Sequence, residues 1–179
     1  MFAAYPSGPS YNQIYDIAII EPSGDITEPV TLAEAKNFCK IDVDDDDTLI
    51  TALITAARVM CEDYTNIGFI ERELIVTLNN RNGGIYLPLG PIPSDLTTVT
   101  DADANDVTFT TGGVDWKQLL TPTYERLIVT YTAGYSVLPE NLKNALLNTI
   151  FYLYDNRATG ADNIGPIAQM LLNPIRRVW

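Results

Sequence analysis

The stretch LPENLKNALLNTIFYLYDNR, residues 138–157, predicts a helix with apolar side chains on more than one face. Pro139 suits the first turn, and residues at helical spacing form a core stripe: Leu142, Ala145, Leu146, Thr149, Ile150, Leu153 and Tyr154. Leu147, Phe151 and Tyr152 lie outside that stripe. Such a helix has to be covered on several sides, and 179 residues leave few elements for this cover. We therefore expect these three residues to lie at an interface between copies of the chain.

A second long helix is expected over residues 45–65, where apolar residues recur at helical spacing from Leu49 to Tyr64. It follows the acidic stretch KIDVDDDDTLI, residues 40–50. Aspartates at a helix start interact favourably with the unpaired N–H groups and the helix dipole. A calcium loop does not fit, because Asp47 stands where the loop needs glycine and Leu53 where it needs glutamate. The sequence predicts a solvated acidic helix end and no metal site.

Two shorter helices complete the helical part, over about residues 31–40 and 164–172. Thr31 and Glu34 form the pattern of a capping box, with Val30 placed to staple the entry. The β region lies between the second and third helices in chain order, those over residues 45–65 and 139–157. There, residues 73–135 hold short segments rich in Val, Ile, Thr and Tyr that alternate with turn residues. The predicted fold class is therefore α+β: a mainly helical body of about four helices, with a small antiparallel sheet or hairpins inserted in it.

We expect three parts along the chain. Residues 1–29 form an N-terminal arm with one strand around the apolar run Ile17–Ile20, residues 30–173 form the main domain, and residues 174–179, PIRRVW, form a basic and aromatic tail. No apolar run is long enough for a membrane span, and the first twenty residues lack the pattern of a signal peptide.

The composition argues against several functions. A net charge of −12 with eleven scattered basic residues opposes tight binding to nucleic-acid phosphates. Histidine is absent, which removes the usual general base and the commonest transition-metal ligand. The glycine pairs suit turns better than phosphate loops. We predict no catalytic residues and no cofactor, and we expect Cys39 and Cys61 to be reduced thiols in the core.

Two blocks of the chain resemble the head-tail connector (adaptor) family of long-tailed bacteriophages. The first runs from VTLAEAKNFCKID through DDDDTLITALITAARVMCEDYTN, and the second joins LIVTYTAGY to LPENLKNALLNTIFYLYDNR. They cover about residues 30–77 and 127–157 in the same order as in that family. Residues 1–29 precede the point where the family pattern usually starts, and residues 100–124 match nothing in it.

The resemblance implies a structural role in the virion neck, with synthesis in the cytoplasm of the host bacterium. Copies would form a ring, expected to be a dodecamer, beneath the portal protein. The ring would extend the DNA channel toward a stopper or tail-terminator protein, and DNA would pass through its lumen without specific binding. A ring of identical head-to-tail contacts would also supply the missing cover of the helix over 139–157.

The resemblance also suggests roles for two segments. The tail, Pro174, Ile175, Arg176, Arg177, Val178 and Trp179, combines residue types common at interface hot spots and is a candidate portal contact; the alternative is a disordered or back-folded chain end. Asp44, Asp45, Asp46 and Asp47 would repel DNA if they faced the channel; the alternative is the solvated helix end. For the whole protein, the alternatives are a packaging accessory that contacts DNA directly and a hydrolase with a carboxylate pair.

Overall fold

The computed structural model describes residues 13–20, 26–80, 84–93, 96–114, 116–122, 124–158 and 163–177. The chain divides into two compact units, one built of strands and one built of helices. The helical unit comprises Ser23–Glu71, Pro88–Pro91 and Gly134–Trp179, and the remaining residues form the strand unit. Helices and antiparallel sheets are both present, which confirms the predicted α+β class.

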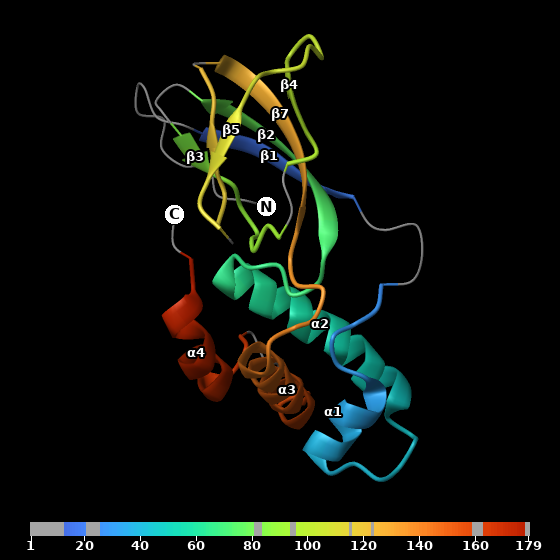
Figure 1. Ribbon diagram of the computed structural model, residues 1–179. Helices are drawn as coiled ribbons and strands as arrows, with labels where there is room; N and C mark the ends of the chain where they lie inside the picture. The colour runs from blue at the N-terminus through green and yellow to red at the C-terminus, as the bar shows by residue number, and fades with distance from the viewer. Residues whose placement is uncertain are drawn as a thin grey trace. The chain divides into compact units, whose positions relative to one another are not determined.

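The larger sheet of the strand unit has four antiparallel strands in the order β1-β2-β7-β4 (Figure 1). Its strands are β1 (Gln13–Ile20), β2 (Arg72–Asn80), β7 (Tyr124–Ala133) and β4 (Thr98–Asp101). Strand β1 lies within the segment expected to be an arm and pairs with β2. A smaller antiparallel sheet has the order β3-β6-β5, with β3 (Gly84–Tyr86), β6 (Gln118–Leu120) and β5 (Thr110–Gly112).

The register of β2 and β7 explains why this unit has a core. Along β2, buried positions alternate with half-buried ones, which is the pattern of a strand with one face in the core. Three cross-strand pairs each join two fully buried side chains: Leu74 with Tyr131, Val76 with Val129, and Leu78 with Leu127. In the smaller sheet, Leu119 and its partner Ile85 are also buried. Each sheet therefore contributes one apolar face to the interior of the strand unit.

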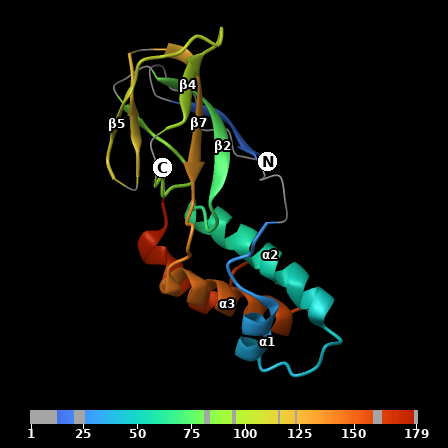
Figure 2. The ribbon, with the colours of Figure 1, turned by 45° about the vertical axis from the view of Figure 1, so that its right-hand side comes forward.

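The helical unit contains four α-helices and a short 3₁₀ helix among the described residues (Figures 1 and 2). They are α1 (Leu32–Cys39), α2 (Asp47–Thr65), α3 (Glu140–Asp155), α4 (Pro166–Leu172) and η1 (Asn173–Ile175). Helix α3 contacts α1, α2 and α4. Its buried residues are Leu142, Ala145, Leu146, Thr149, Ile150 and Leu153, so six of the seven predicted stripe positions lie in the core.

Local signals at the helix ends agree with the structure. Thr31 caps α1: its hydroxyl accepts the N–H of Glu34 at 3.2 Å, and a Glu34 carboxylate oxygen accepts the N–H of Thr31 at 2.9 Å. This is the predicted capping box. Lys40 ends α1 in the left-handed conformation, and Asn66 ends α2 in the same way. These ends determine where the chain leaves each helix.

The segment Pro88–Pro91 belongs to the helical unit although it lies between strands in the sequence. The N–H of Gly68 donates to the carbonyl oxygen of Gly90 at 3.1 Å, and the N–H of Gly134 donates to that of Pro91 at 2.8 Å. Gly134 has φ of +105°, and a Cβ there would lie 2.0 Å from the carbonyl oxygen of Ile70. Only glycine fits this crossing of three backbone segments.

Candidate interaction surfaces of the helical unit

The three α3 residues outside the predicted stripe have different surroundings. Phe151 has 44% of its surface exposed, and it lies on the side of α3 opposite the buried stripe. Leu147, one helical turn earlier, is half-buried. Tyr152 is also half-buried, and it packs against Gly165 of its own chain. The packing is close, because a Cβ added to Gly165 would lie 2.7 Å from the Tyr152 ring. Phe151, with Leu147 beside it, is thus the more open part of the predicted interface.

Helices α1 and α4 flank α3 on different sides (Figure 2). On the α1 side, the ammonium group of Lys143 lies 2.5 Å from a carboxylate oxygen of Glu34. On the α4 side, the hydroxyl of Thr149 donates to the carbonyl oxygen of Ile164 at 3.1 Å. Positions 143 and 149 are six residues apart, which places them on different sides of a helix.

The contact between α1 and α3 changes the ionisation of Glu34. The Lys143 ammonium group, followed by the N–H and hydroxyl of Thr31, lowers the pKa of Glu34 from 4.5 to about 2. Both partners are partly exposed, with 43% of the Glu34 side chain open to solvent. Water therefore screens this pair, and its contribution to stability is small.

Three of the four aspartates in the predicted acidic patch have partners within the helical unit. The Lys36 ammonium group lies 2.6 Å from both Asp44 and Asp47, which lowers the pKa of Asp44 and raises that of Lys36. The hydroxyl of Tyr154 donates to Asp46 at 2.5 Å. Asp45 is exposed. In the described part of the chain, no group of three or more Cys, Asp or Glu residues is placed to hold a metal ion.

The described part of the C-terminal tail lies back on the end of α2. The Tyr64 hydroxyl donates to Asn173 at 2.5 Å, and the guanidinium of Arg176 lies over the Tyr64 ring, 4.6 Å from its centroid. The N–H of Arg177 donates to the carbonyl oxygen of Thr65 at 2.9 Å. Pro174 and Ile175 lie in η1. Val178 and Trp179, which belong to the same predicted portal contact, lie outside the described residues.

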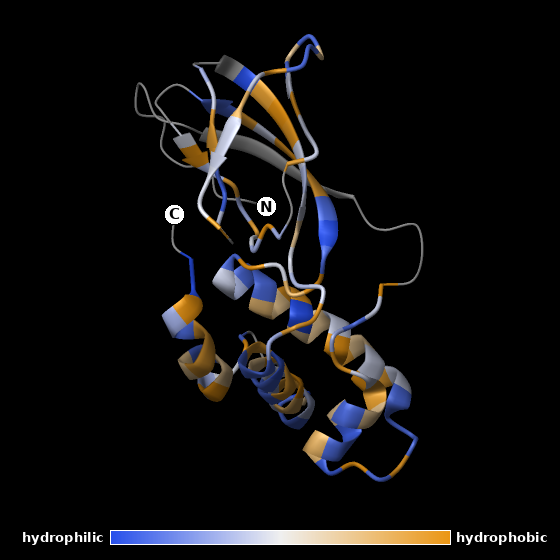
Figure 3. Ribbon diagram, in the orientation of Figure 1, coloured by the Kyte–Doolittle hydropathy of each residue, from blue (hydrophilic) through white to orange (hydrophobic). Residues whose placement is uncertain are grey.

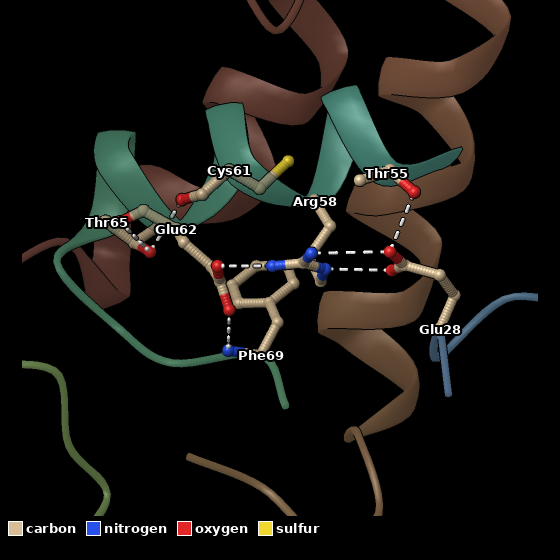
Figure 4. Close-up of polar contacts among 7 residues, drawn as sticks. All are labelled: Glu28, Thr55, Arg58, Cys61, Glu62, Thr65 and Phe69. Atoms are coloured by element: carbon tan, nitrogen blue, oxygen red, sulfur yellow. Dashed lines mark hydrogen bonds and ion pairs between the residues drawn. The ribbon is translucent and has the colours of Figure 1, made fainter. Parts of the chain in front are cut away.

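A buried ion network, which the sequence patterns did not predict, connects three segments of the helical unit (Figure 4). Arg58 is central: its side chain is 3% exposed, its Nε donates to Glu28 at 2.8 Å, and its Nη1 donates to Glu62 at 2.9 Å. The second oxygen of Glu62 accepts the N–H of Phe69 at 2.7 Å. Glu28 also accepts the Thr55 hydroxyl at 2.9 Å. The network thus connects the segment before α1, the middle of α2 and the segment after α2.

The charged side chains of this network stabilise one another in their buried positions. Burial alone would lower the pKa of Arg58, but the Glu28 and Glu62 carboxylates outweigh burial and raise it. A buried guanidinium without these partners would be strongly unfavourable. Arg58 and Glu62 stand four residues apart, which is a helical ion-pair spacing, and they adjoin the apolar stripe at Ala57 and Cys61. Glu28, thirty residues before Arg58, has no such local signal.

The two cysteines are free thiols, as predicted, but only one lies in the core. Cys61 is buried in α2, where its Sγ lies 3.4 Å from the Thr149 hydroxyl of α3. Burial raises the pKa of Cys61 to about 11. Cys39, at the end of α1, is half-buried, and burial raises its pKa as well. The prediction of a core position is therefore wrong for Cys39, because α1 is short and exposes its last turn.

None of the helices in the described residues is long and apolar enough to cross a membrane. The candidate interaction surfaces described above include exposed residues of α1, α3 and the segment that precedes α2.

A sequence profile of the head completion protein family matches residues 28–165. This match spans most of the chain, so the chain belongs to the head completion protein family. It is a structural protein of the virion and not an enzyme. The matched region contains both blocks that carried the resemblance to phage connectors, which is thereby confirmed. A comparison with curated protein sequences gives no match.

Solved structures with the same fold include chains of gene transfer agent particles. A chain in the neck of an empty gene transfer agent (GTA) particle, computed with C6 symmetry, has a TM-score of 0.71 at 18% identity, over 92% of this chain and 97% of that chain. A chain from the virion of a native GTA particle has a TM-score of 0.71 at 19% identity, over 90% and 96%. A third, from a native GTA neck computed with C12 symmetry, has a TM-score of 0.61 at 20% identity, over 90% and 96%.

Proposed function

We propose that this protein is a connector of the virion neck, whose copies form a ring beneath the portal and extend the channel through which DNA leaves the head. The observation that carries the proposal is the family match over residues 28–165, together with a fold shared with a chain from a GTA neck. The C6 and C12 symmetries of those necks support a closed ring, and the C12 symmetry supports twelve copies. A stopper or tail-terminator protein would bind the far side of the ring.

In this proposal, residues 30–173 form the connector domain, with residues 1–29 as an arm and residues 174–179 as a tail. The family match begins and ends close to the limits of that domain. Strands β2–β7 follow α2 and precede α3 in the chain, which supports a β region inserted between the second and third long helices. Strand β1 is the part of the arm that the structure describes, and it pairs with β2.

Electron microscopy of the protein mixed with purified portal tests the proposal directly. We expect rings on one end of the portal, and a portal left bare at micromolar concentrations of the protein would refute it. Phe151→Asp should reduce ring formation, because it places a charge in an apolar contact. Val114→Asp is a matched control, since Val114 is exposed in the strand unit.

The tail is proposed to contact the portal through its last residues. Truncation after Arg177 removes Val178 and Trp179 and leaves the contacts of Arg176 and Arg177 with α2 in place. We expect this truncated protein to keep its thermal stability and to lose portal affinity. Unchanged affinity would assign the portal contact to another surface.

The acidic patch Asp44–Asp47 is proposed to face the DNA channel. Asp45 is the best position for a test, because the other three aspartates have partners within the chain. Asp45→Lys should leave ring assembly intact and slow DNA exit, because it adds attraction for phosphates at the channel wall. An unchanged rate of DNA exit would favour the solvated helix end.

A salt series distinguishes the connector from a packaging accessory that binds DNA directly. Binding to phosphates weakens steeply as salt rises, because it releases counterions. A connector of this charge should show little affinity for linear duplex DNA even at about 50 mM salt. Tight binding at low salt that disappears as salt rises would instead support the accessory.

A further inference from the structure

Helix α4 has an apolar face that its own unit does not cover. Ile167 is 53% exposed and Met170 is 66% exposed, and their spacing of three places them on one side of the helix. The buried residues of α4, Ala168 and Leu172, lie on its other side. Figure 3 shows hydrophobic colour over much of this short helix. An exposed pair of large apolar residues on such a helix is typical of a contact surface.

The sequence around α4 has an unusual charge for this chain. Residues 163–177 contain no acidic residue and two arginines, although the net charge of the whole chain is −12. Arg176 is exposed and keeps its position by stacking on Tyr64. We call Ile167, Met170 and Arg176 the α4 surface. It combines an apolar centre with a positive edge.

A second surface of the helical unit has the opposite charge. Phe38, in the last turn of α1, is 38% exposed, and Val43, in the following connection, is 57% exposed. Asp42 stands beside Val43 and is exposed. Residues 40–47 contain one lysine and five aspartates, a net charge of −4. We call Phe38, Asp42 and Val43 the α1 surface. It combines exposed apolar residues with a negative edge.

The two surfaces belong to helices on different sides of α3. Figures 1 and 2 show α4 on one side of α3 and α1 on the other. Tyr152 packs on Gly165 just before α4, whereas Lys143 pairs with Glu34 of α1. When two different surfaces on opposite sides of a protein pair with each other, the contact is heterologous and copies join head to tail. Such an array closes into a ring where the rotation between neighbouring copies permits it.

We infer that the α4 surface of one copy binds the α1 surface of the next copy, with Ile167 and Met170 against Phe38 and Val43, and Arg176 facing Asp42. The occupant is a second copy because the charges and apolar residues of the two surfaces are complementary. The inference rests on the proposed ring and specifies which surfaces form it. Phe151 is not among the residues of either surface, so its role is tested separately by Phe151→Asp.

Disulfide cross-linking between copies tests the inference. Val43→Cys and Met170→Cys are made separately in a Cys39→Ser background, and the two proteins are mixed under ring-forming conditions and oxidised. We expect a covalent dimer that contains one copy of each protein. Val114→Cys mixed with Met170→Cys is the control, because Val114 is 81% exposed in the strand unit, and it should give no dimer above background.

Charge exchange gives a second, independent measurement. Asp42→Arg or Arg176→Asp alone should lower the yield of rings on the portal about tenfold or more, since like charges then meet across the contact. The double variant should recover most of the yield. Rings that form normally with no cross-link and no charge effect would overturn the inference and leave the proposed function standing. No rings with any protein, including the unchanged one, would overturn both.

Discussion

The Nε atom of Arg58 donates to a carboxylate oxygen of Glu28 at 2.8 Å, and this bond joins the middle of α2 to the chain just before α1. The two partners are 30 positions apart in the sequence, and the residues between them include all of α1 and the acidic connection. This guanidinium therefore adds to the contacts that position α1, which include the pairs Lys36–Asp47 with α2 and Glu34–Lys143 with α3. The same guanidinium reaches the segment after α2 through Glu62 and the N–H of Phe69.

Replacing Arg58 should be among the most damaging single changes in the helical unit. Arg58→Ala leaves the Glu62 carboxylate buried without its main cation, and we expect the free energy of unfolding to fall by about 3–5 kcal/mol. Urea denaturation followed by circular dichroism measures this loss. Arg126→Ala is the control: Arg126 is exposed on β7, and its loss should change stability by less than about 0.5 kcal/mol. Equal losses for the two variants would contradict the proposed importance of the network.

The pair Glu34–Lys143 predicts a weak dependence of stability on pH. The folded-state pKa of Glu34, about 2, lies below its ordinary value of 4.5. The stabilisation is therefore fully present above pH 4.5 and is lost as the pH falls toward 2. At pH 7, Glu34→Gln should cost less than about 1 kcal/mol, because the pair is partly exposed. The difference from the unchanged protein in urea denaturation should shrink between pH 5 and 3.

Two glycines predict losses of stability of different size for the same substitution to alanine. Gly134→Ala brings a Cβ to 2.0 Å from the Ile70 carbonyl oxygen at φ of +105°, so we expect a loss of more than about 1 kcal/mol in the free energy of unfolding. Gly112→Ala meets only a Leu120 side-chain carbon at 3.9 Å and should cost less than about 1 kcal/mol. Thermal denaturation of the two variants side by side measures both. A Gly134→Ala protein as stable as Gly112→Ala would mean that the crossing of backbone segments can relax.

The two thiols should differ strongly in reactivity. Cys61 is fully buried, and with a pKa of about 11 only about one in a thousand of its side chains would be ionised at pH 8. A thiol reagent that releases a coloured product should label Cys39 alone in the folded protein and both cysteines in urea. Cys39→Ser should abolish the labelling of the folded protein. Rapid labelling of Cys61 would reveal frequent opening of the α2–α3 contact.

Much of the fold followed from local patterns. The stripe in residues 138–157 predicted the buried side of α3, because residues three and four apart meet on one helix face whatever lies beyond it. The capping box at Thr31 was equally predictable, since both partners lie within one turn. The same patterns, taken in order along the chain, carried the resemblance that the family match confirms.

Local sequence patterns did not predict which elements pack against α3. The sequence indicated few elements that could cover this helix, whereas α1, α2 and α4 of the same chain all contact it. The periodicity of one helix shows which of its faces need cover, but not which elements supply it. Among the three residues expected at an interface, the contact between Tyr152 and Gly165 distinguishes Tyr152 from Phe151, and it depends on where α4 packs.

The sequence alone thus predicted the helix positions, the helix ends, the β character of the central region and the family. Each of these depends on residues that are close neighbours in the sequence, or on a series of such local patterns. The pairing of β1 with β2, the partners of Asp44, Asp46 and Asp47, and the bond between Arg58 and Glu28 were decided only when distant segments packed together. Burial and charge pairing are properties of three-dimensional neighbourhoods. For this reason the guanidinium of Arg58, a group usually found at the surface, is buried in the helical unit.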